Sequence, residues 1–190
     1  MKATKTRLAI YLVFGLALCS LTACSRDRGV EAARDDQTPS VTPAEQDFMM
    51  KVAQGQMGEI EIARFAFKKS TNNDVKDYAN MIERDHTSAL NTLATLMKDK
   101  NVSQQKGLTP DAQQAISTLN GLTGPEFDRE FINVMVTDHQ KVLGMFRDQQ
   151  ATVQDTQLKD YVEEMIPTLE MHLDKAQQLQ SKLFSSPTSR

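Results

Sequence analysis

Apolar side chains recur every three to four residues along four long stretches of the chain, with polar side chains between them. This spacing, about 100° per residue, is typical of amphipathic helices. The pattern predicts four long helices: one that begins near Thr42, one that follows the polar turn at residues 70–73, one over residues 125–150 and one over residues 155–183. A shorter helix, from residue 109 to about residue 119, is expected in the connection between the second and third long helices.

Four amphipathic helices of similar length bury their apolar faces by packing against one another. The sequence therefore predicts an all-α fold, a four-helix bundle over residues 44–183 with one short extra helix. Because the connection between the second and third long helices is long, those two helices can run parallel or antiparallel. Thr42, followed three residues later by Glu45, predicts a capping box at the start of the first helix.

Ionisable residues interrupt the apolar faces near the middle of the long helices. The central ones are, helix by helix, Glu59, His86, His139 and His172. Mid-helix residues share one layer of a bundle whichever way each helix runs, so we expect these side chains to meet in the core. Glu83 and Asp138 lie at the edges of the same faces and are further candidates for this layer.

A carboxylate buried among imidazoles needs compensation, either from a paired side chain or from a bound cation. Sets of carboxylates and imidazoles suit iron, manganese, zinc or copper. The candidate ligands of a divalent metal are therefore Glu59, Glu83, His86, Asp138, His139 and His172. The pattern assigns no other cofactor and no catalytic residue.

Di-iron sites in ferritin-like bundles use one glutamate from each of two helices and Glu-x-x-His from the other two. Glu59 and Glu83-x-x-His86 match half of this plan, but Leu169 occupies the position where the fourth helix needs a glutamate. Three hypotheses remain. In the first, the protein is not an enzyme and its polar layer binds a divalent metal. In the second, it is a metal-dependent oxidase or a peroxide-handling enzyme. In the third, it is a structural or interaction module with a hydrogen-bonded polar core and no metal.

The first residues predict a lipoprotein signal peptide. A basic segment precedes the apolar residues 8–21, and small residues then lead to Cys24. This order resembles the lipobox of bacterial lipoproteins, where cleavage leaves a lipidated cysteine as the first residue. We expect a signal peptide at residues 1–23, a lipidated Cys24 with a flexible tether at 24–43, and a polar tail at 184–190. The protein would then be anchored by its lipid and face the periplasm, with Ser25 favouring the outer membrane.

Composition narrows the classes of partner and ligand. The chain has 190 residues, a formal net charge of −3, no tryptophan and no block of basic residues, which argues against nucleic-acid binding. Removal of Cys19 with the signal peptide and acylation of Cys24 would leave the mature protein without a free thiol. Any metal site would therefore use nitrogen and oxygen ligands. The sequence indicates no protein partner.

Short patterns in all four long helices resemble those of an exported bacterial family. They are Asp47-Phe48, Ala53-Gln54-Gly55-x-Met57-x-Glu59-Ile60, Val75-x-x-Tyr78-Ala79-x-Met81-Ile82-x-x-Asp85-His86, Asp138-His139 and Ile166-Pro167-x-Leu169-x-x-His172. At these positions the chain is similar to the family called domain of unknown function 4142, over roughly residues 44–183. The resemblance implies a ferritin-like four-helix bundle, a location in the cell envelope and a shared site at Glu59, Asp85, His86, Asp138, His139 and His172.

Overall fold

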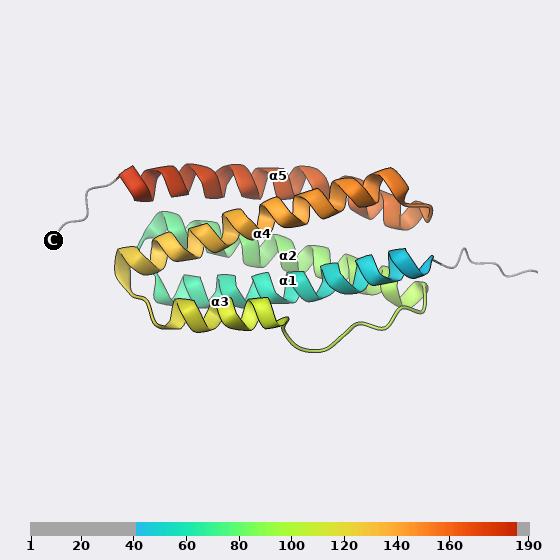
Figure 1. Ribbon diagram of the computed structural model, residues 1–190, viewed down its shortest axis with the longest axis horizontal. Helices are drawn as coiled ribbons and strands as arrows, with labels where there is room; N and C mark the ends of the chain where they lie inside the picture. Colours follow the sequence, from blue (N-terminus) through green and yellow to red (C-terminus); the bar gives the residue numbers. More distant parts are fainter. Residues whose placement is uncertain (1–40, 186–190) are drawn as a thin grey trace, which may run out of the picture. The chain divides into compact units, whose positions relative to one another are not determined.

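The computed structural model describes residues 41–185, which form a bundle of α-helices (Figure 1). The helices are α1 (Pro43–Lys69), α2 (Asn73–Asp99), α3 (Pro110–Asn120), α4 (Gly124–Thr152) and α5 (Thr156–Ser185). No strand occurs between residues 41 and 185. The prediction of an all-α four-helix bundle with a short additional helix is confirmed.

The predictions for both ends of the chain concern residues outside this range. The signal peptide at 1–23, the lipidation of Cys24 and most of the tether at 24–43 precede residue 41, and most of the polar tail follows residue 185. Of the helices in the described part of the chain, none is both long and apolar enough to cross a bilayer.

The four long helices form two antiparallel hairpins. A short turn joins α1 to α2, another joins α4 to α5, and the two helices of each hairpin pack closely together. The connection from α2 to α4 runs back along the bundle and contains α3, so α2 and α4 point in the same direction (Figure 1). A single long crossover of this kind is the connectivity of ferritin-like bundles. The crossover makes α2 and α4 parallel, which answers the question of orientation that the sequence left open.

Side-chain caps mark the start of α1 and of α2. Thr42 Oγ1 accepts a hydrogen bond from the Glu45 N–H at 3.2 Å, and the Glu45 carboxylate accepts one from the Thr42 N–H at 2.7 Å. This is the predicted capping box. Asn72 caps α2 by accepting a hydrogen bond from the Asp74 N–H at 3.0 Å. Each cap stabilises its helix by roughly 0.5–2 kcal/mol relative to alanine.

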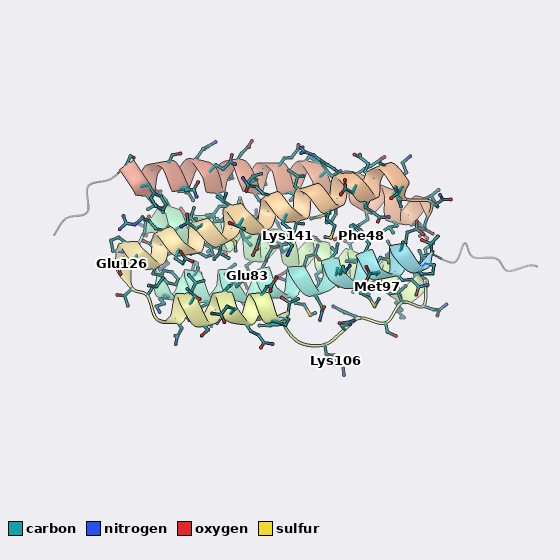
Figure 2. The ribbon with its side chains drawn as sticks, viewed as in Figure 1. Phe48, Glu83, Met97, Lys106, Glu126 and Lys141 are labelled. Atoms are coloured by element: carbon teal, nitrogen blue, oxygen red, sulfur yellow. The ribbon has the colours of Figure 1, made fainter. Side chains whose placement is uncertain are left out.

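The core consists of two hydrophobic clusters, one toward each end of the bundle. The first combines the amino-terminal half of α1 with the carboxyl-terminal half of α2, and its members Phe48 and Met97 lie toward the same end of the bundle in Figure 2. The second contains the opposite halves of these helices together with Phe127 and Phe131 of α4. Burial of each large side chain contributes roughly 1.5–3 kcal/mol. The clusters hold the helices in register, which fixes the level of the residues between them.

Candidate metal centre

The predicted polar layer lies between the two hydrophobic clusters. In α2, for example, Ile82 belongs to the second cluster, Ala89 belongs to the first, and His86 lies between them. In each of the other long helices, a polar residue likewise lies between members of the two clusters. These residues are Glu59 in α1, His139 in α4 and His172 in α5. The exposed fraction is 6% for Glu59 and at most 1% for each histidine. The layer is therefore a fully buried polar group inside an apolar core.

The three imidazoles face one another. One ring nitrogen from each of His86, His139 and His172 lies within 4.8 Å of the nitrogens from the other two. His139 Nε2 is 3.4 Å from His172 Nδ1. Glu59 lies beside the group, with its Oε2 3.0 Å from His86 Nδ1 and its Oε1 3.6 Å from His139 Nδ1. Four helices thus contribute three nitrogen donors and one carboxylate to one small volume.

Hydrogen bonds on the far side of two rings determine where their lone pairs lie. His139 Nδ1 is 2.9 Å from the Met135 carbonyl oxygen, and because a carbonyl only accepts, this nitrogen carries the proton. His172 Nε2 is 3.0 Å from Asp85 Oδ2, and it donates to that carboxylate in the same way. In the neutral rings, the lone pairs are therefore on His139 Nε2 and His172 Nδ1. These two atoms face each other, and their lone pairs repel unless a proton or a cation lies between them.

Burial keeps the imidazoles uncharged at neutral pH. It lowers the pKa of His86 well below its usual value, and the neighbouring histidines lower it further. Burial also lowers the pKa of His139 to about 4 and lowers that of His172, although Asp85 partly offsets the effect on His172. The neutral imidazole is the form that binds a metal ion. The three rings are therefore in the protonation state that binds a metal ion.

Several buried atoms of this layer make no hydrogen bond to any part of residues 41–185. They are both ring nitrogens of His86 and Oε1 of Glu59. His86 Nδ1 lies 3.0 Å from Glu59 Oε2, but this contact does not have the geometry of a hydrogen bond. An unsatisfied buried polar group costs about 1–3 kcal/mol. Burial raises the pKa of the Glu59 carboxyl to about 8, and the negative charge of Asp138 contributes to the rise. Within residues 41–185, no positively charged group faces Glu59, and the nitrogens of His86 and one oxygen of Glu59 lack hydrogen-bond partners.

A tetrahedral metal ion would meet both needs. Zinc binds imidazole nitrogens at about 2.0–2.1 Å, so two nitrogens on one tetrahedral zinc lie about 3.3 Å apart. The separation of His139 Nε2 and His172 Nδ1 is 3.4 Å. Metal-bound histidines usually donate their other N–H to a carboxylate or a backbone carbonyl, as these two rings do. The donor set suits a transition metal better than calcium or magnesium.

Two of the six predicted ligands lie outside the converging group. Glu83 is partly exposed and accepts a hydrogen bond from Arg64 Nε at 2.7 Å. Asp138 is half-buried and lines a pocket that Glu59 also lines. Asp85, which only the family resemblance had indicated, instead positions His172 from the opposite edge of the α2 face. Which edge of α2 faces α5 depends on helix packing, which periodicity alone does not determine.

The converging residues differ from a di-iron set. Leu169 is buried in the first hydrophobic cluster, and Glu170 forms an ion pair with Arg147 at 2.7 Å on the surface. Within residues 41–185, the converging group consists of three imidazoles with the Glu59 carboxyl group beside His86, whereas a di-iron bundle supplies four carboxylates and two imidazoles. This composition favours a single metal ion.

Sequence reasoning did not identify Gln56 as part of the polar core. Gln56 is buried, and its Nε2 donates a hydrogen bond to the Tyr161 hydroxyl at 2.7 Å. Its Oε1 has no hydrogen-bond partner in the described part of the chain. Its position three residues before Glu59, on the same face of α1, was the available signal.

Comparison with known proteins supports the fold and identifies a family. The structure is similar to a crystal structure of a DUF305 fragment from Deinococcus radiodurans, with a TM-score of 0.68 and 14% sequence identity, over 76% of this chain and 99% of that chain. At this identity the similarity shows the fold alone. No curated protein matches the sequence. The sequence matches the family described as Domain of unknown function (DUF4142) over residues 30–179. The chain therefore belongs to the DUF4142 family.

Proposed function

We propose that this protein is a lipid-anchored protein of the bacterial cell envelope that binds one divalent transition-metal ion in the middle of its helix bundle. The proposed ligands are Glu59, His86, His139 and His172. The envelope location rests on the signal-peptide and lipobox pattern at residues 1–24. Zinc serves as the reference metal because the spacing of two imidazole nitrogens matches tetrahedral coordination.

The facing lone pairs of His139 and His172 carry the proposal. Each ring has its other nitrogen committed to an acceptor, at 2.9 Å for His139 and 3.0 Å for His172. The two remaining nitrogens are 3.4 Å apart in a buried site. A hydrogen-bonded core without metal would need an added proton between these rings, and burial opposes the charge of that proton.

The role we propose is binding rather than catalysis. Catalytic zinc sites keep one position open for water or substrate, whereas structural sites use four protein ligands. The three histidines, from α2, α4 and α5, form the cluster of nitrogens, and Glu59 of α1, 3.0 Å from His86 Nδ1, is proposed as the fourth ligand. A bound ion would therefore cross-link all four long helices. In this proposal Glu83 and Asp138 are not ligands. Glu83 forms an ion pair with Arg64, and Asp138 lines the pocket beside the site.

Elemental analysis of the full-length protein, purified from its native membrane compartment, tests this proposal. We expect about one equivalent of a single transition metal in the wild type, as in a mononuclear site. The His86→Ala and His172→Ala variants should contain almost none. Ser70→Ala is the matched control, because it removes a buried 2.6 Å hydrogen bond to Asp128 far from the histidines. It should lower stability and keep the metal.

A wild type that contains no metal would contradict the proposal. That result would favour the structural alternative, in which one imidazole carries an extra proton and the layer is a hydrogen-bonded core. Metal that is retained in both histidine variants would also contradict it, because the metal would then be bound elsewhere on the chain.

A further inference from the structure

A pocket of about 430 Å³ opens on the side of the bundle where α1 and α4 meet the start of α3. Three acidic side chains line it, namely Glu59, Asp111 and Asp138. Two lysines also line it, and one of them, Lys141, lies about half-way along α4 (Figure 2). The apolar part of the lining includes Ile62, Val142 and Met145. The pocket therefore lies at the level of the imidazoles and is lined by both acidic and apolar side chains.

The three carboxyl groups differ in depth. Asp111 is exposed, Asp138 is half-buried, and Glu59 is only 6% exposed. Each lysine of the pocket forms an ion pair with an exposed acid. Lys51 pairs with Asp47 at 2.6 Å, and Lys141 lies 3.7 Å from Asp111. Lys141 also acts on Asp138 through its charge, but neither lysine forms an ion pair with Asp138 or Glu59, so these two are the acids that line the deeper part of the pocket.

Glu59 is the link between the pocket and the imidazoles. It lines the pocket, and its carboxylate also lies 3.0 Å from His86 Nδ1 and 3.6 Å from His139 Nδ1. Its Oε1 is buried and makes no hydrogen bond with residues 41–185. A buried, unpartnered carboxyl oxygen at the base of an acidic pocket is a ligand for a cation that arrives from solvent and displaces the carboxyl proton.

We propose that this pocket is the route by which the divalent cation reaches the imidazoles, with Asp138 holding the ion first and Glu59 passing it inward. This inference rests on the metal site proposed above. The carboxylate on the other side of the layer is less suited to the same task. Asp85 already accepts hydrogen bonds from Arg84 at 2.8 Å and from His172 at 3.0 Å, so both of its oxygens are committed.

The two glycines of α1 beside the pocket have different structural roles. A Cβ atom at Gly58 would approach Ala112 Cβ to 2.8 Å, so Gly58 permits α3 to pack closely on α1. A Cβ atom at Gly55 would meet nothing within 4 Å, although a helix-interior glycine costs about 1 kcal/mol relative to alanine. Packing therefore does not require Gly55. It lines the pocket, where the absence of a side chain keeps the route open.

Stopped-flow measurement of zinc uptake and release by the metal-free full-length protein tests the route. Gly55→Leu places a side chain in the pocket without replacing a proposed ligand. Because an obstacle in a route changes the barrier and leaves both end states unaltered, we expect association and dissociation to slow by the same factor, about tenfold or more, with Kd unchanged. Gly144→Leu is the matched control, since a Cβ there also meets nothing within 4 Å and Gly144 lines a different pocket. It should keep wild-type rates.

Asp138→Asn provides a second test that does not change the size of a side chain. It should slow zinc association several-fold and leave the stoichiometry unchanged. Wild-type protein that binds no zinc would overturn both the site and the route. Wild-type protein that binds zinc, together with Gly55→Leu and Asp138→Asn at wild-type association rates, would overturn the route alone. Equal slowing in Gly144→Leu would also overturn the route, because the effect would not be specific to this pocket.

Discussion

Glu45 and Glu59 are both buried glutamates of α1, and their surroundings differ in a way that explains the site. At the start of the helix, the Glu45 carboxylate accepts hydrogen bonds from the backbone N–H groups of Thr42, Gln154 and Asp155 at 2.7, 2.8 and 3.0 Å. Burial alone would raise its pKa, but these donors lower it to about 2. No backbone N–H group of residues 41–185 donates to Glu59, and burial raises its pKa to about 8.

The neighbours of the two glutamates show the same contrast. Beside Glu45, the ammonium group of Lys100 and the carboxylate of Asp155 form an ion pair in which each side chain is 3% exposed, and Asp155 also accepts a hydrogen bond from the Leu158 N–H at 2.9 Å. Beside Glu59, neither ring nitrogen of His86 makes a hydrogen bond within residues 41–185, although Nδ1 lies 3.0 Å from Glu59 Oε2. The chain supplies partners for buried polar groups at the end of the bundle. In the middle, we infer that the partner comes from outside the chain.

The largest expected effect comes from breaking the paired cluster at the end of the bundle. Lys100→Met leaves the Asp155 carboxylate buried without its cation, which should lower the free energy of unfolding by about 3–5 kcal/mol. Urea unfolding followed by circular dichroism measures this loss. Lys98→Met is the matched control, because Lys98 is exposed on the same turn of chain. A small effect of Lys100→Met, equal to that of the control, would contradict the distinction between the two regions.

A second effect should appear in the pH dependence of stability of the metal-free protein. The pKa of Glu59 is raised in the folded state to about 8, so its stabilising contribution is complete below the unfolded pKa of 4.5 and is lost as the pH rises through 8. Between pH 5 and pH 8, Glu59→Gln should therefore gain stability relative to the wild type. Urea unfolding at several pH values, without metal, measures the difference.

Glu45→Gln is the control for this comparison. The pKa of Glu45 is lowered to about 2, so its contribution is complete above pH 4.5 and is lost only as the pH falls toward 2. The difference between Glu45→Gln and the wild type should therefore be constant from pH 5 to pH 8. A constant difference for Glu59→Gln over the same range would show that Glu59 is not held protonated by its surroundings.

Much of the fold follows from local sequence patterns. The 3.6-residue periodicity predicts all four long helices, and the capping box at Thr42 and Glu45 places the start of α1 correctly. The direction of α4 relative to α2 was not predictable, because residues 100–109 are mostly polar and contain no periodic pattern that indicates how the chain returns. Contacts between α3 and α1, where Gly58 approaches Ala112, help to determine that direction.

The polar layer was predictable as a level in the bundle, but its pairings were not. Mid-helix position was sufficient to group Glu59 with the three histidines, whose ring nitrogens the structure places within 4.8 Å of one another. Glu83 and Asp85 flank the apolar face of α2 symmetrically, so only the packing of α5 shows that Asp85 contacts His172. The pairing of Lys100 with Asp155 joins residues far apart in sequence, and no local pattern indicates it.

Unfolding of the wild type and of His86→Leu, each with and without zinc, tests most directly whether the layer is built for a metal ion. Without metal, the variant should be more stable by about 1 kcal/mol, because leucine replaces an imidazole with unsatisfied nitrogens. Zinc at a hundredfold excess over its Kd should stabilise the wild type by about 2.7 kcal/mol and leave the variant unchanged. A metal-free wild type that is more stable than the variant, and that zinc does not stabilise, would contradict the account and identify the layer as a structural polar core.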